Sequence, residues 1–213
     1  MGSPGRRDDL AAAGSRAVVG RWWDDGAVSD PWTKPTGLTA VLIAVPELAG
    51  YTDRWRTASR SSARPDVALS ELIPPHVTVL VPWVEDPSPE DVQRLIESVA
   101  DVQPFELSFP SAGQFPNGTV WLRPEPFDAV RELVTTVLGA FPECPAYGGQ
   151  YPDPHPHLTI SSSAQGGVSL LEEARATLAA TAAPTVRLDD LTIWREGDDQ
   201  VWQLIGSVPL GAR

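Results

Sequence analysis

The sequence predicts a mixed α+β chain with antiparallel strand pairs, built from two comparable halves. Short strand-like runs alternate with segments whose apolar residues recur at helical spacing. The turn signal Asn117-Gly118 separates two strand-like runs, as expected of a hairpin or of loop-linked strands. A five-residue frame of proline, histidine, aliphatic residue, threonine and aliphatic residue also occurs twice, at 75–79 and 156–160, once in each half.

The first half is expected to open with a strand and a helix. Residues 38–45 (LTAVLIAV) form a continuous apolar run, which predicts a buried strand, and Pro46 ends it. The next segment, 47–60, is expected to be helical because apolar side chains such as Tyr51 and Trp55 recur at helical spacing.

A loop at 61–75 leads to the second strand and helix. The strand is expected at 77–84, where aliphatic residues predominate, and the helix at 89–102. Ser88 followed by Pro89 predicts where this helix begins, because serine is a favoured N-cap and proline fits the first helical position.

The alternation continues through the second half. Strand-like runs at 105–109 and 119–122 flank the turn signal, and apolar residues at helical spacing predict a helix at 127–141. A loop rich in proline and glycine separates this helix from the second copy of the frame. The remaining elements are expected to be a strand at 157–161, a helix at 169–181, and two strands at 186–195 and 200–209.

Composition limits the classes of partner and site. The net charge is −12, and neutralising many phosphates needs a basic surface, so we expect neither long duplex nucleic acid nor a membrane as partner. A small anionic ligand needs only a local site. Cys144 is the only cysteine, which excludes an intrachain disulfide framework and a cysteine-based zinc site. No apolar stretch reaches about 18 residues, and Arg16 interrupts any secretory signal, so we expect a cytoplasmic protein.

Residues 1–36 differ from the rest of the chain, because no helical or strand period persists through them. They predict a partly flexible N-terminal extension, followed by a domain at 37–213. Trp22, Trp23 and Trp32 indicate that part of the extension is ordered, since exposed tryptophan clusters are unusual without a surface to cover. The extension could pack on the domain, close a cleft or bind a protein partner.

The repeated frame carries the chemistry. Alternate residues of a strand face the same side, so His76 and Thr78 share one face, about 6–7 Å apart, and His157 and Thr159 do the same. If the halves pack with approximate two-fold symmetry, the two pairs converge on one small volume.

Two imidazoles and two hydroxyls in one volume suit phosphodiester chemistry. One imidazole takes a proton from the attacking oxygen and the other gives a proton to the leaving oxygen. Histidine titrates near neutral pH, so one neutral and one charged ring can coexist. The threonine hydroxyls can donate hydrogen bonds to the phosphoryl oxygens, where charge builds up. This chemistry requires no metal and no cofactor.

Five further residues are candidate substrate contacts. Two arginines that follow strand-like runs could neutralise a phosphate, or lie on the surface. Two tyrosines in the loop before the second frame could stack on a base, or pack the loop. A serine continues the face of the second histidine and could line the same volume, or end a solvated strand. These residues are Arg123, Arg195, Tyr147, Tyr151 and Ser161.

Other site chemistries are disfavoured. His155 and His157 are a weak metal pair, because Pro156 separates them and no clear third ligand is present, so we expect His155 to be a loop residue. The sequence also contains neither a GxSxG elbow nor a phosphate-cradling P-loop.

The segments PPHVTVLVPW and PHPHLTIS resemble the two HxT motifs of the 2H phosphoesterase superfamily, which includes the 2′-5′ RNA ligase-like proteins. The resemblance covers about 38–210. It implies a two-lobed fold around a central groove, each lobe an antiparallel sheet with helices outside. It implies His76 and His157 as the acid/base pair and Thr78 and Thr159 as phosphate-holding hydroxyls.

The same resemblance implies an activity. It is the metal-independent opening of a cyclic phosphodiester, typically a 2′,3′-cyclic phosphate of a small nucleotide or RNA end, or the reverse ligation to a 2′-5′ linkage. A binding module that uses the same groove for a nucleotide or a protein is the alternative from a different class. Intact histidines and threonines in both motifs favour the enzyme.

Overall fold

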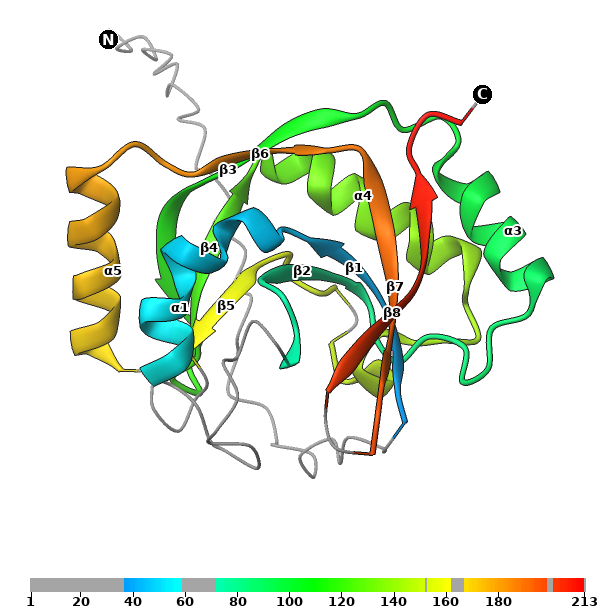
Figure 1. Ribbon diagram of the computed structural model, residues 1–213, viewed down its shortest axis with the longest axis horizontal. Helices are drawn as coiled ribbons and strands as arrows, with labels where there is room; N and C mark the ends of the chain where they lie inside the picture. Colours follow the sequence, from blue (N-terminus) through cyan, green and yellow to red (C-terminus); the bar gives the residue numbers. More distant parts are fainter. Residues whose placement is uncertain (1–36, 59–71, 152, 162–166, 199–200, 213) are drawn as a thin grey trace, which may run out of the picture. The chain divides into compact units, whose positions relative to one another are not determined.

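The computed structural model describes residues 37–58, 72–151, 153–161, 167–198 and 201–212. All of them belong to one compact unit, Trp32–Arg213. The N-terminal extension with its three tryptophans lies outside the described residues. The predicted mixed α+β class with antiparallel strands is confirmed (Figure 1).

The described residues form eight strands, four α-helices and two 3-10 turns. The strands are β1 (Thr39–Ala44), β2 (His76–Leu80), β3 (Phe105–Gln114), β4 (Val120–Glu125), β5 (Leu158–Ser161), β6 (Thr185–Leu188), β7 (Asp190–Glu196) and β8 (Trp202–Pro209). The helices are α1 (Ala49–Ala58), α3 (Pro89–Val99), α4 (Phe127–Ala140) and α5 (Val168–Ala180), and the 3-10 turns are η1 (Pro46–Leu48) and η2 (Ala146–Gly149).

The eight strands form one antiparallel sheet in the order β6-β3-β4-β5-β2-β1-β7-β8. The order is symmetric about the central pair of β5 and β2, because the strand that precedes each of them in the chain, β4 or β1, lies directly beside it. β3 and β7 follow on the two outer sides. The pairing of β5 with β2 joins the two halves of this single sheet, and they do not correspond to the two halves of the chain, because the C-terminal strands β7 and β8 lie beyond β1. The two copies of the repeated frame meet at this central pair.

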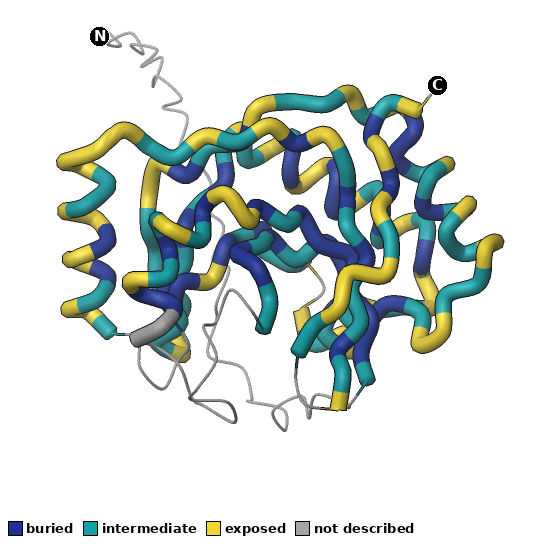
Figure 2. The backbone as a smooth tube through the Cα atoms, viewed as in Figure 1, coloured by how far each residue is buried: buried dark blue, intermediate teal, exposed yellow. Residues whose placement is uncertain are grey.

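One side of the central pair belongs to the hydrophobic core. Val77 of β2 and Leu158 of β5 are partners in the pairing, and both are fully buried. The same core includes Trp55 of α1 and Val134 of α4, and α1 packs against β5 while α4 packs against β2 and β4. Figure 2 shows how the buried residues follow these central strands. The alternate residues, which include both histidines, face the other way.

The start of α3 confirms the predicted helix signal. Ser88 is the N-cap, and its Oγ accepts a hydrogen bond from the backbone N–H of Asp91 at 3.2 Å. The Asp91 carboxylate accepts in return from the backbone N–H of Ser88 at 3.0 Å. This reciprocal capping box, with Pro89 at the first helical position, explains why the chain leaves the loop there.

The single strand predicted at 186–195 is wrong. The segment forms two strands, because β6 pairs with β3 at one edge of the sheet while β7 pairs with β1 toward the other edge. Figure 1 shows the orange segment crossing between these positions. Each piece alternates, but the phase changes between them: Leu188 is the buried position of β6, whereas Leu191 and Ile193 are buried in β7, so the strand period is interrupted at Asp189-Asp190, where the partner changes.

Candidate active site

The pairing of β2 with β5 brings the two HxT motifs together. Val77 pairs with Leu158 in antiparallel register. Continuing that register by one residue on each side places His76 beside Thr159, and Thr78 beside His157. Directly opposite residues of an antiparallel pair have Cβ atoms about 4.5–5.5 Å apart. The four side chains therefore form a compact square on the sheet face opposite the core.

Both histidines make the same local hydrogen bond. The Nδ1 atom of His76 lies 2.8 Å from the carbonyl oxygen of Pro74, and Nδ1 of His157 lies 2.6 Å from that of His155. A carbonyl oxygen only accepts, so Nδ1 carries the hydrogen in both rings. The tautomer is thereby fixed, and Nε2 accepts a proton when the ring is neutral and donates one when it is charged.

Burial favours the neutral form of both rings. Desolvation lowers the pKa of His76 to about 4, and the charges of Arg56 and His157 act in the same direction. Desolvation also lowers the pKa of His157 to about 4, assisted by His155. The hydrogen bonds to the carbonyl oxygens oppose these shifts in both cases. Without a bound anion, both imidazoles are therefore neutral at pH 7.

Arg56 is a residue of the site region that the sequence did not indicate. Its side chain is buried on α1 and donates to the carbonyl oxygen of Ile73 at 2.7 Å. It also forms an ion pair with Asp53 at 3.3 Å. Arg56 thus ties the segment that precedes His76 to α1. From the sequence alone, Arg56 looks like any solvated arginine on a helix. Its burial could not be predicted, because the group that it binds in the loop is a backbone carbonyl.

The two candidate tyrosines lie at the first motif. The Tyr147 side chain hydrogen-bonds to Thr78, and burial raises the pKa of its hydroxyl. Its backbone N–H donates to the carbonyl oxygen of Val81 at 2.6 Å, which holds the η2 turn against the end of β2. Tyr151 packs edge-on against Tyr147, with ring centroids 5.5 Å apart, and remains exposed.

An aromatic cluster surrounds the second motif. The Phe115 ring stands perpendicular to His157, with centroids 4.8 Å apart. Trp121 is the cross-strand partner of Thr159, and its ring lies 4.9 Å from that of His155. Phe115 and Trp121 were not predicted as site residues, since β4 and the turn that follows β3 reach the motif only through the pairing of β4 with β5.

The remaining candidates divide between the two sheet faces. Leu122 pairs with Leu158, so the same register places Arg123 beside His157 on the site face. The Arg123 guanidinium lies over the Phe127 ring at 3.9 Å and pairs with Glu125 at 2.8 Å.

Arg195 and Ser161 are not placed to contact a substrate at the two motifs. Arg195 forms an ion pair with Asp86 at 2.9 Å, and it alternates with Trp194, so it points to the other side of the sheet. Ser161 is buried and pairs with Val120 at the far end of β5. The site face therefore holds Arg123 and Tyr147 but not Arg195.

Two features of the described residues bear on metal binding and on membrane spans. Within those ranges, no group of three or more histidine, cysteine, aspartate or glutamate side chains is placed to hold a metal ion. None of the helices seen in that part of the chain has the length and apolar character needed to cross a membrane.

Solved structures share this fold. E. coli LigT complexed with 3′-AMP superposes with a TM-score of 0.54 at 17% identity, over 83% of this chain and 99% of LigT. LigT complexed with NADP⁺ gives 0.51 at 18% identity, over 84% and 99%. A structure described as a phosphoesterase gives 0.52 at 17% identity, over 83% and 99%. Curated protein sequences contain no match.

The sequence itself decides the family. The sequence model of the 2′-5′ RNA ligase superfamily matches residues 44–200, which is most of the chain and includes both HxT motifs. Together with the fold, this confirms the resemblance to the 2H phosphoesterases, and the chain belongs to the 2′-5′ RNA ligase superfamily.

Proposed function

We propose that this protein is a metal-independent cyclic phosphodiesterase that opens the 2′,3′-cyclic phosphate of a small nucleotide or RNA end. The observation that carries the proposal is the square of two histidines and two threonines, with both rings held in the same tautomer. A binding protein has no need for two proton-transfer groups fixed in this way.

The proposed reaction uses the four side chains in pairs. A neutral imidazole accepts a proton at Nε2 from water, whose oxygen forms a bond to phosphorus. The other imidazole, protonated, donates its Nε2 proton to the ribose oxygen as the P–O bond breaks. The hydroxyls of Thr78 and Thr159 donate hydrogen bonds to the non-bridging oxygens, on which negative charge builds up. A proton exchange with solvent restores the starting state of the two rings.

The low pKa of both rings gives the substrate a part in this cycle. His76 and His157 are neutral in the free protein at pH 7, whereas the reaction needs one of them charged. A cyclic phosphate carries one negative charge, and an opposite charge within about 4–6 Å favours the protonated imidazole. The bound anion therefore supplies the charge that raises the pKa of one ring.

The solved relatives support a nucleotide as the substrate. LigT shares the fold and its structures include complexes with 3′-AMP and NADP⁺. The net charge of −12 supports a ligand with few phosphates, since each phosphate of a long nucleic acid needs its own cation.

The test is turnover in EDTA of 2′,3′-cyclic mononucleotides and of a short RNA that ends in a 2′,3′-cyclic phosphate. His76→Ala and His157→Ala are each expected to lose about 10²–10⁴-fold in kcat. Thr135→Ala, an exposed position on α4, is the control for Thr78→Ala and Thr159→Ala. Full activity in either histidine variant would refute the proposed roles. Binding of a cyclic nucleotide without turnover would favour the binding module.

A further inference from the structure

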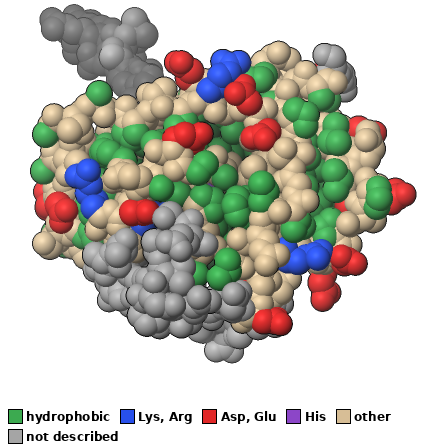
Figure 3. Space-filling model, viewed as in Figure 1, with side chains coloured by type: hydrophobic (Ala, Val, Ile, Leu, Met, Phe, Trp, Pro, Cys, Tyr) green, Lys and Arg blue, Asp and Glu red, His purple; other side chains and the backbone are tan. Residues whose placement is uncertain are grey.

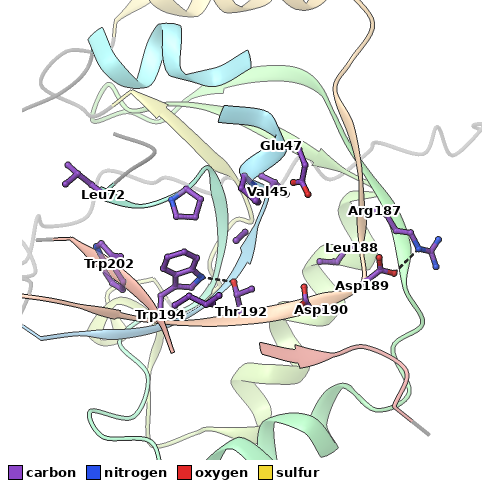
Figure 4. Close-up of a pocket in the computed structure, with 14 residues that line it drawn as sticks. Val45, Glu47, Leu72, Arg187, Leu188, Asp189, Asp190, Thr192, Trp194 and Trp202 are labelled. Atoms are coloured by element: carbon purple, nitrogen blue, oxygen red, sulfur yellow. Dashed lines mark hydrogen bonds and ion pairs between the residues drawn. The ribbon is translucent and has the colours of Figure 1, made fainter. Parts of the chain in front are cut away.

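A cavity of about 560 Å³ adjoins the first histidine. Ala44 and Pro74 line it (Figure 4). Ala44 is the cross-strand partner of His76, and the carbonyl oxygen of Pro74 accepts the hydrogen bond from that ring. The cavity therefore lies next to the proposed reaction site through these two residues, and its volume is in the range of small-molecule pockets.

The sheet register gives the span from the reaction site into the cavity. Thr78 pairs with Leu42, and Leu42 pairs with Thr192, which lines the cavity. The three residues thus stand in one row across β2, β1 and β7, on the face of the histidines. Two strand spacings amount to about 10 Å. A base and its ribose phosphate together span that distance.

Two tryptophans line one side of the cavity, Trp194 and Trp202 (Figure 4). The Trp194 Nε1–H donates to Oγ1 of Thr192 at 2.8 Å, and that hydroxyl donates to the carbonyl oxygen of Leu42 at 3.1 Å. The indole is thereby fixed and its only donor is used. Stacking on an indole that lines the cavity is favourable for any aromatic base.

Carboxylates line the other side. Glu47 and Asp190 border the cavity there, beside Asp189, whose carboxylate is paired with Arg187 at 2.8 Å (Figure 4). Figure 3 shows acidic side chains around a hydrophobic area on one face of the molecule. Carboxylate oxygens accept hydrogen bonds and repel phosphate. The lining therefore suits a flat group that carries hydrogen-bond donors.

Aromatic rings pack on the side of the second histidine. Phe115 and Trp121 pack against His157 and His155 on that side of the central pair. A nucleoside attached to the reacting phosphate therefore finds room on the side of His76.

We propose that this cavity binds the base of the substrate nucleotide and selects a base with an exocyclic amino group. This inference rests on the proposed function, because the phosphate of the same nucleotide is placed at the histidines. Cytosine carries an amino donor where uracil carries a carbonyl oxygen, and the two bases are otherwise nearly identical in shape. The carboxylate of Asp190 or Glu47 accepts from the first and repels the second.

The test compares kcat/KM for 2′,3′-cyclic CMP and 2′,3′-cyclic UMP. Wild type is expected to prefer the cytidine substrate by about 10-fold, the effect of one charge-assisted hydrogen bond. Asp190→Asn turns an acceptor into a group that also donates, so it is expected to reduce or reverse the preference. Asp128→Asn, an exposed position on α4 away from the cavity, is its control.

Stacking is tested separately at Trp194. Trp194→Ala is expected to raise KM about 10-fold for both substrates with little change in kcat, and Trp194→Phe to restore most of the affinity. Calorimetric titration with cytidine, which has no phosphate, measures the same pocket without turnover and is expected to weaken in Trp194→Ala.

The outcomes separate the inference from the proposed function. If His76→Ala abolishes turnover while the cytidine-to-uridine ratio is near one and Trp194→Ala changes neither KM nor cytidine binding, the base pocket is refuted alone. If no cyclic phosphate is turned over but cytidine binds and Trp194→Ala removes that binding, the proposed function is refuted and the pocket is supported.

Discussion

Acidification is expected to destabilise this protein through its two central histidines. Burial lowers the pKa of His76 and of His157 from 6.5 to about 4 in the folded chain. The unfolded chain has no such burial, so it binds protons first as the pH falls. The contribution of each ring to stability is fully present above about pH 6.5 and is lost between about pH 6.5 and 4.

The size of the effect follows from the shift. One pKa unit corresponds to about 1.4 kcal/mol, so the shift of each ring from 6.5 to about 4 corresponds to about 3 kcal/mol. The two rings together therefore account for about 6 kcal/mol, which is comparable with the whole unfolding free energy of many domains. Carboxylates also titrate in this range, so the histidine contribution is isolated by comparing variants with wild type.

Asparagine is the informative replacement, because its amide nitrogen lies near the position of Nδ1 and still donates to the carbonyl two residues earlier. Urea unfolding of wild type, His76→Asn and His157→Asn is measured in steps from pH 7.5 to 4. Each variant is expected to lose about 3 kcal/mol less than wild type over this range. Thr135→Ala controls for a neutral change. Parallel loss of stability in wild type and both histidine variants would refute the low pKa values.

Three further changes test the surroundings of the site. Tyr147→Phe removes the hydrogen bond to Thr78 and is expected to lower kcat/KM by up to about 10-fold, measured with a cyclic mononucleotide. Gly113→Ala places a Cβ against the Trp121 ring, so it should lower the unfolding free energy by about 1–3 kcal/mol and reduce activity; an unchanged urea midpoint would contradict this contact. Ser88→Ala removes the N-cap of α3 and should cost about 1 kcal/mol of stability, with kcat/KM unchanged.

Local periodicity explains why most of the fold could be predicted. The buried run at 38–45 contains β1 (Thr39–Ala44), and helical spacing located α4 to within one residue of its end. The segment 186–195 was predicted as one strand because the change of phase in its apolar alternation, from Val186 and Leu188 to Leu191 and Ile193, was missed. The chain changes its partner from β3 to β1 at this point, and which strands become the partners depends on contacts far apart in sequence that no local pattern encodes.

The same distinction holds for the site. Strand alternation placed His76 with Thr78 and His157 with Thr159, and the sheet pairs the two motifs directly. Contacts made by residues far apart in sequence could not be predicted in this way. The bond from Arg56 to a loop carbonyl and the packing of Phe115 against His157 depend on how α1, β3 and β5 come together, which no local pattern encodes.

The near-symmetry of the central strands sets a requirement for the proposed chemistry. A two-histidine mechanism needs one acid and one base, but His76 and His157 have the same tautomer and nearly the same low pKa. The motifs therefore cannot distinguish the two roles. The surroundings can, because a cavity lined by Ala44 and Pro74 lies on the side of His76, while the Phe115 ring packs against His157. In the proposed complex, a nucleotide with its base in that cavity would present a different oxygen to each ring, so the substrate itself would supply the asymmetry that the sheet lacks.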